Sequence, residues 1–171
     1  MNGLNIGIEQ INEQQPDVVP PANEPTNLVI MLKKAVCDES TAEYQYIIAG
    51  HMARGAGYCD VTPEYAQHAD EERDHKFKLL KRLEQLGFMF SLDLINLSNG
   101  GNPWTPITTN NIPQQLDILI KAEADAQEFY KQIIAEARKV NDDITVQLIK
   151  GLLADECEHE TDLRRIREQF E

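Results

Sequence analysis

A glutamate-containing motif that occurs twice constrains the fold of this 171-residue chain more than any other feature. The motif is Glu-x-x-His, and its two copies run from Glu72 to His75 and from Glu156 to His159. In an α-helix, a spacing of three residues places both side chains on neighbouring rows of one face. Each motif glutamate also shares its helical stripe with apolar residues, which predicts that it faces a core.

A further glutamate precedes each motif at the same distance. Glu39 lies 33 residues before Glu72, and Glu123 lies 33 residues before Glu156. Each of these glutamates falls on the apolar stripe of its own helical stretch, and a tyrosine follows it seven residues later. The two tyrosines are Tyr46 and Tyr130. The chain therefore contains a twofold internal repeat, which predicts four helices that bring four glutamates into one core.

Four buried carboxylates need positive charge. Each would cost several kcal/mol to desolvate, and the four would repel one another. A single core glutamate is commonly paired with Lys or Arg, but the apolar stripes of these four stretches carry neither. Two divalent cations would balance four negative charges, and mixed carboxylate and imidazole ligands suit iron or manganese. The predicted metal ligands are Glu39, Glu72, His75, Glu123, Glu156 and His159.

The remaining pattern predicts an all-α four-helix bundle with a long crossover between the second and third helices and no fifth helix. Residues 1–26 contain four of the eight prolines and no Lys or Arg, and they are predicted to form a tail or arm that precedes a bundle over residues 27–171. Thr62 is the expected N-cap of the second helix, with Pro63 at its first position. The expected helices cover 27–55, 63–87, 113–140 and 144–170.

Composition excludes several classes of function. With 29 acidic and 16 basic residues the formal net charge is -13, so neither nucleic acid nor an anionic membrane surface is an expected partner. The longest apolar run, residues 28–32, is far too short to span a membrane. Three cysteines without regular spacing do not form a disulfide framework, and no signal-peptide pattern is present. These features favour a cytoplasmic protein.

The ligand pattern resembles that of the ferritin superfamily, and in particular bacterioferritin, over residues 28–171. The segment from Glu39 to Tyr46 is similar to the first-helix motif of that family, and the other predicted ligands match its remaining positions. The resemblance implies that Glu72 and Glu156 bridge two irons. It also implies that Glu39 with His75 completes one iron and Glu123 with His159 the other. Tyr46 would be a one-electron donor.

Departures from bacterioferritin narrow the expectation. Arg73 stands where bacterioferritin carries its haem-ligating methionine, so haem is not expected. The missing fifth helix is characteristic of Dps-type cages of twelve subunits. Cys37 and Cys157 lie close to ligands in sequence, as in the Dps-like proteins called thioferritins, and this implies a redox role for Cys157. Inert thiols remain the alternative. His51 and His68 lack ligand spacing and are expected at the surface or in an interface.

The resemblance implies a ferroxidase that oxidises Fe(II) with hydrogen peroxide or oxygen, stores Fe(III) mineral in a hollow homododecamer and protects against oxidative stress. A rubrerythrin-like peroxidase without storage is one alternative. It is disfavoured because the chain has no paired Cys-x-x-Cys motifs and has Ala126 where an additional glutamate would stand. A manganese catalase-like enzyme is another, since the ligand types do not separate iron from manganese. A DNA-compacting role is disfavoured by the tail without Lys or Arg.

Overall fold

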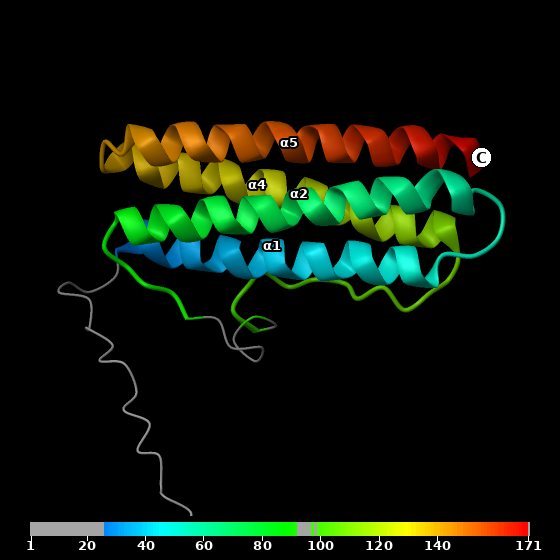
Figure 1. The fold of residues 1–171 in the computed structure, drawn as a ribbon. Coiled ribbons are helices and arrows are strands. Elements are labelled where there is room, and N and C mark those ends of the chain that lie inside the picture. The colour runs from blue at the N-terminus through cyan, green and yellow to red at the C-terminus, as the bar shows by residue number, and fades with distance from the viewer. Residues whose placement is uncertain (1–25, 92–96, 98, 171) are drawn as a thin grey trace, which may run out of the picture.

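The computed structural model describes residues 26–91, 97 and 99–170. Within these ranges four long helices form an antiparallel bundle (Figure 1). They are α1 (Asn27–Met52), α2 (Tyr58–Gln85), α4 (Ile112–Lys139) and α5 (Asp143–Arg167), and a short 3-10 helix follows at Glu168–Phe170. The predicted four-helix bundle with a long crossover is therefore confirmed. The predicted tail lies, except for Thr26, outside the described residues.

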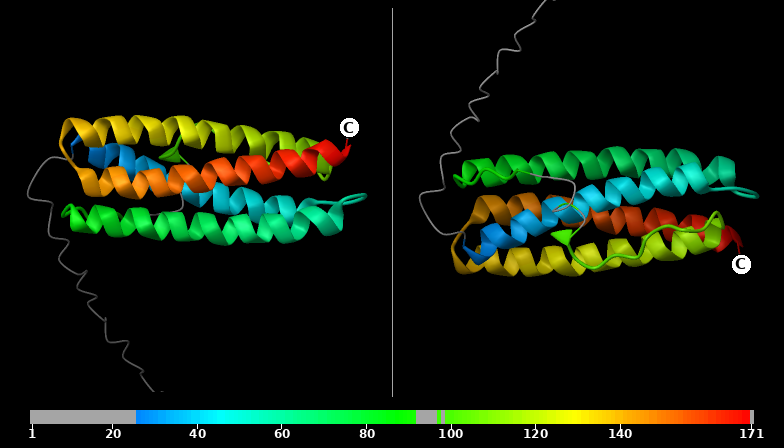
Figure 2. Two further views of the ribbon diagram at one scale, coloured as in Figure 1. Left: turned by 90° about the horizontal axis from the view of Figure 1, so that it is seen from above. Right: turned by 90° about the horizontal axis from the view of Figure 1, so that it is seen from below.

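Two helical hairpins build the bundle. Short connections join α1 to α2 and α4 to α5. The described part of the long connection after α2, residues 99–111, runs along the bundle beside α1 and α4 (Figure 2). Asp38 of α1 holds this crossover, since its carboxylate accepts hydrogen bonds from the backbone N–H of Asn102 at 2.5 Å and from its side-chain amide at 2.7 Å. A Cβ on Gly101 would lie 2.3 Å from the Asp38 carboxylate, so only glycine permits this approach. None of the described helices is long and apolar enough to cross a bilayer.

The apolar core is divided in two along the bundle. One cluster combines the first half of α1 and α5 with the second half of α2 and α4, and it includes Leu32, Leu79 and Ile133. The other combines the opposite halves and includes Tyr65 and Leu116. Because every helix contributes to both clusters, the middle of each helix faces a layer that neither cluster fills. The predicted core glutamates lie in this layer.

The start of α2 differs from the prediction. The helix begins at Tyr58, and Thr62 is not its N-cap: the Thr62 hydroxyl donates to the Tyr58 carbonyl at 2.9 Å. Gly57 is the N-cap with a φ of 80°, and a Cβ there would lie 2.3 Å from the ring of Phe170. Pro63 is tolerated inside the helix because it lies so near the N-terminus that its missing N–H removes only one hydrogen bond of the first turns. The helix α1 also ends earlier than expected, at Met52.

An ion pair ties the two hairpins together at one end of the bundle. Arg82 of α2 donates to both carboxylate oxygens of Asp142 at 2.7 and 2.8 Å and to the hydroxyl of Thr145 at 2.7 Å. Asp142 is also the N-cap of α5, where it accepts from the Thr145 N–H at 3.0 Å. Burial raises the pKa of Asp142, but the hydrogen bonds from Arg82 and Thr145 outweigh this and hold the pKa below its ordinary value.

We expect Asp142→Ala to destabilise the bundle by about 1–3 kcal/mol, because it removes a helix cap and leaves Arg82 without its partner. Since the folded pKa of Asp142 is depressed, its contribution is complete above the ordinary aspartate pKa of about 3.9 and is lost as pH falls through the lower folded value. Melting temperatures at one protein concentration, from pH 7 down to pH 3, measure this. Asp143→Ala is the matched control, and a loss as large as that of Asp142→Ala would contradict the ion pair's role.

Candidate metal centre

The predicted ligands converge in the layer between the two apolar clusters. All six are buried, with at most 3% of each residue exposed. Their ligand atoms form two groups, and within each group these atoms lie within 4.8 Å of one another. The first group is Glu39, Glu72, His75 and Glu156, and the second is Glu72, Glu123, Glu156 and His159. Glu72 and Glu156 belong to both groups, which is the arrangement that two bridged cations require.

The two imidazoles occupy equivalent positions. Nδ1 of His75 lies 3.2 Å from Glu72, 3.2 Å from Glu156 and 3.5 Å from Glu39. Nδ1 of His159 lies 3.2 Å from Glu72, 3.3 Å from Glu156 and 3.9 Å from Glu123. Each helix pair therefore supplies one imidazole whose Nδ1 points at the shared carboxylates.

The other nitrogen of each imidazole meets a second acid. Nε2 of His75 lies 3.1 Å from Asp155 of α5, and Nε2 of His159 lies 2.9 Å from Glu71 of α2. A carboxylate on one ring nitrogen fixes the ring and makes the other nitrogen a better ligand. The contacts of Asp155 and Glu71 were not predicted from the sequence, although each residue immediately precedes a motif glutamate and thus belongs to the repeat.

The tyrosines of the repeat also act across the bundle. The buried Tyr46 hydroxyl of α1 donates to Glu123 of α4, and the Tyr130 hydroxyl of α4 donates to Glu39 of α1. Each half of the chain thus positions the outer glutamate of the other half. The redox role predicted for Tyr46 stays a prediction. Tyr130 was part of the predicted repeat, but its contact with Glu39 was not foreseen.

Burial and mutual repulsion shift the pKa values of the ligands in this layer. Burial, followed by repulsion from Glu72 and Glu156, raises the pKa of Glu39, and burial with repulsion from Glu156 does the same to the pKa of Glu123. Burial lowers the pKa of His75 and His159, but their contacts with the glutamates raise it far more. These shifts favour the protonated forms of the outer glutamates and of both imidazoles.

Several atoms of the layer lie close to other ligand atoms but form no hydrogen bond of favourable geometry. They are Oε2 of Glu39, Oε1 of Glu72, Oε1 of Glu156 and Nδ1 of His159. Among the described residues, no Lys or Arg pairs with any of the four glutamates. Buried polar atoms without partners are rare in proteins and call for a ligand. The donor set fits two divalent cations.

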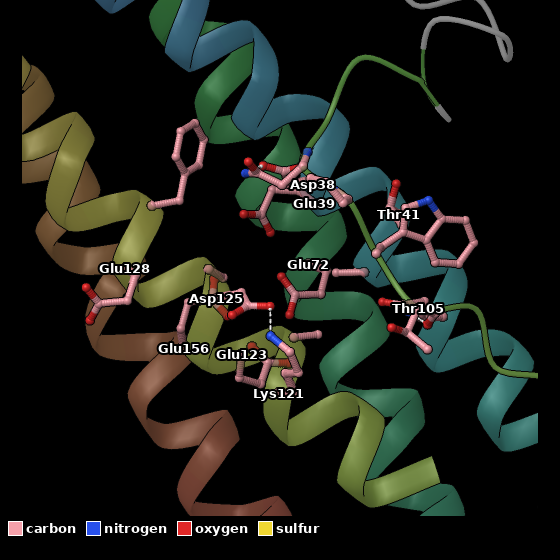
Figure 3. Close-up of a pocket in the computed structure, with 18 of the residues that line it drawn as sticks. Asp38, Glu39, Thr41, Glu72, Thr105, Lys121, Glu123, Asp125, Glu128 and Glu156 are labelled. Atoms are coloured by element: carbon pink, nitrogen blue, oxygen red, sulfur yellow. Dashed lines mark hydrogen bonds and ion pairs between the residues drawn. The ribbon is translucent and has the colours of Figure 1, made fainter. Parts of the chain in front are cut away.

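The layer can be reached from two sides of the bundle. A cavity of about 770 Å³ between α1, α4 and the crossover extends to all four glutamates (Figure 3). Asp38, Asp117, Asp125 and Glu128 also line it, so its walls attract cations. A smaller cavity of about 260 Å³ lies between α2 and α5 and reaches both motif histidines. Glu43 forms ion pairs with Arg73 at 2.9 Å and with Lys76, so its carboxylate is already neutralised beside the site.

The prediction that His68 lies at the surface or in an interface is wrong. Only 1% of this residue is exposed, and its ring stacks on His159 with centroids 4.1 Å apart. Burial, and then the proximity of His159, lowers the pKa of His68 to about 4. His68 lies one helical turn before Glu72, so its helical phase is that of a buried residue. Its spacing from other histidines and acids is not that of a ligand motif, and its burial was therefore not predicted. His51 is exposed, as expected.

The cysteines lie in different surroundings. Cys37 is buried, and this burial with the charge of Asp38 raises the pKa of its thiol. Cys59 and Cys157 are exposed. The Cys157 thiol donates to the side-chain oxygen of Gln127 of α4 at 3.3 Å, and it lines neither of the two cavities. Its predicted redox role stays a prediction.

A four-helix bundle with carboxylate and histidine ligands in its central layer defines a class of carboxylate-rich metal-binding bundles. The profile of the ferritin-like domain matches residues 30–171, and the chain belongs to this family. A comparison with curated protein sequences gives no significant match.

Solved structures agree with the family assignment. A dodecameric thioferritin, the bacterioferritin-related protein from Bacteroides fragilis, is 27% identical with a TM-score of 0.81 over 86% of this chain and 88% of its own. Dps from Staphylococcus aureus is 13% identical, with a TM-score of 0.77 over 81% and 93% of the two chains. BfrA from M. tuberculosis is 19% identical, with a TM-score of 0.71 over 84% of each. The last two share the fold.

Because the pKa shifts favour protonated ligands in the metal-free centre, we expect cation binding to release protons. Raised pKa values keep the outer glutamates and both imidazoles protonated until higher pH, and a ligand must lose its proton before it binds. Apparent affinity for Co(II) should therefore rise between pH 6 and pH 8, by roughly tenfold per pH unit for each proton displaced. Calorimetric titrations in two buffers of different ionisation enthalpy count the protons. Affinity that is independent of pH would contradict this account.

Proposed function

We propose that the protein is a ferroxidase that detoxifies and stores iron. The observation that carries this proposal is the pair of ligand groups that share Glu72 and Glu156. Such a layer binds two Fe(II) ions side by side as substrates, with Glu39 and His75 completing one position and Glu123 and His159 the other. The acidic cavity beside α1 and α4 draws Fe(II) toward the layer.

Two adjacent Fe(II) ions suit a two-electron oxidant. Each ion gives up one electron, so two Fe(II), one hydrogen peroxide and two protons yield two Fe(III) and two water molecules, without releasing hydroxyl radical. Oxygen accepts four electrons and needs more than one such pair of ions. We propose that Tyr46 supplies a further electron, and the contact of its buried hydroxyl with Glu123 supports this role. Cys157 is proposed to take part in the same redox chemistry because of the resemblance to thioferritins, and its thiol lines neither of the two cavities.

Ala126 bears on the rubrerythrin-like alternative. This residue lines the large cavity, at the position where an additional carboxylate would be expected in a rubrerythrin-like site. A site without that carboxylate favours ferroxidase over peroxidase. Iron is the proposed metal, and manganese is the alternative that metal analysis of the purified protein decides. No haem is proposed.

The decisive experiment removes one negative charge from a shared ligand. We expect Glu72→Gln and Glu156→Gln to lower the initial rate of Fe(II) oxidation by hydrogen peroxide by roughly tenfold or more. Without metal, each variant should keep or exceed the wild-type melting temperature, because carboxylate repulsion falls. Glu84→Gln, an exposed change on the same helix, is the control and should behave as wild type.

If the glutamates were instead neutralised by structural cationic side chains, the same changes would strand a buried charge. The variants would then lose about 3–5 kcal/mol of stability and retain their oxidation rate. That pair of results would overturn the metal-centre assignment.

Storage requires an enclosed space, and we propose a hollow homododecamer in the cytoplasm. The thioferritin described above is dodecameric, and its similarity to this chain supports the same assembly. Each chain has a net charge of -13, so the cage is not proposed to bind DNA or membranes.

The proposed assembly predicts a particle of twelve 19.4 kDa subunits, about 233 kDa. Light scattering coupled to size exclusion measures the mass at micromolar concentration. A stable monomer or dimer would rule out the cage, and a particle of twice the expected mass would indicate a bacterioferritin-sized assembly.

A further inference from the structure

Three side chains form a separate group beside the central layer. Glu64 and His68 are four residues apart on α2, and Asp162 faces them from α5. Their ligand atoms lie within 4.8 Å of one another. Residues four apart on a helix lie on one face and can hold the same ion. None of the three belongs to the two ligand groups described above.

The state of His68 points independently to a ligand. Its side chain is buried, borders the cavity between α2 and α5, and has an Nδ1 atom without any hydrogen-bond partner. His75 and His159 each have an acid on their outer nitrogen, whereas the contact nearest to His68 is Glu64, at 3.4 Å from Nε2. Because Nδ1 forms no hydrogen bond and Nε2 contacts only Glu64 among the described acids, the imidazole has a nitrogen lone pair to offer to a cation at this group.

The other possible metal ligands near His68 are less available to bind an ion together with it. His159 and Glu71 also lie near His68, but their side chains are 2.9 Å apart and bonded to each other, and Nδ1 of His159 faces the central layer. Asp162 is paired with Arg165, whose side chain is 69% exposed. An exposed arginine is held only weakly, so it can give up Asp162 to a cation.

We propose that Glu64, His68 and Asp162 form a mononuclear site for a divalent first-row cation such as Fe(II), Co(II) or Zn(II). One imidazole and two carboxylates match the ligand preferences of these ions. Water from the cavity completes the coordination, which makes the ion exchangeable. The site lies on the α2–α5 side of the bundle, away from the crossover (Figure 2). The proposal concerns binding and does not depend on ferroxidase activity.

Co(II) titration of the metal-free, full-length protein tests the site, with bound metal counted by elemental analysis and imidazole ligation followed by absorption. We expect three Co(II) per subunit in the wild type. Asp162→Asn and Glu64→Gln, both at partly exposed positions, should weaken one equivalent by roughly tenfold or more and leave two. His68→Gln should have the same effect and should also remove that equivalent's imidazole signature.

Two further variants make the test specific. Glu158→Gln removes a charge from an exposed residue that lines the same cavity and should leave all three equivalents intact. Arg165→Gln should tighten the third equivalent by roughly two- to fivefold, since it frees Asp162. The double variant Glu72→Gln/Glu156→Gln should lose the central pair and keep the third ion, so the failure of one site is distinguishable from that of the other.

Two results would overturn the proposal. One is a wild-type stoichiometry of two, with Asp162→Asn and Glu64→Gln unchanged. The other is an equal loss in Glu158→Gln, which would show that the cavity merely accumulates cations through its net charge.

Discussion

Four carboxylates buried in one layer of a helical bundle repel one another and lose the hydration that stabilises their charge. The other features of this molecule are arranged around that cost. Apolar clusters on both sides of the layer hold the four helices in register, so the glutamates cannot separate without exposing a core. Tyrosine hydroxyls contact the two outer glutamates, and imidazoles contact the two shared ones. The atoms that these contacts leave unsatisfied are the ones that a bound cation would use.

The twofold repeat works by exchange between its halves. Tyr46 of the first half contacts Glu123 of the second, and Tyr130 of the second half contacts Glu39 of the first. The acids behind the histidines are exchanged in the same way, since Asp155 reaches His75 and Glu71 reaches His159. Neither helical hairpin therefore contains a complete half-site. The centre exists only when both hairpins pack, which couples the metal-binding geometry to the fold as a whole.

The two cavities give the centre distinct surroundings on its two sides. The larger one is bordered by α1, α4 and the crossover, and it is lined by the four glutamates and by further acids outside their layer. The smaller one is bordered by α2 and α5 and contains the histidines, their supporting acids and His68. The glutamates therefore border one cavity, and the histidines with their supporting acids border the other.

The sequence by itself determined the bundle, the long crossover and the convergence of the six predicted ligands, because helical phase and a fixed spacing of 33 residues are properties of the chain alone. It did not determine which half's tyrosine or acid reaches which ligand, because that depends on how the hairpins pack. The surroundings of Cys157 and the burial of His68 were decided in the same way: only the neighbouring helix shows whether a side chain near the boundary of a helical stripe meets solvent or another ring. The predicted helix start at Thr62 and Pro63 was wrong because the helix begins earlier, after Gly57. Gly57 lies against the ring of Phe170, which comes from the other end of the chain.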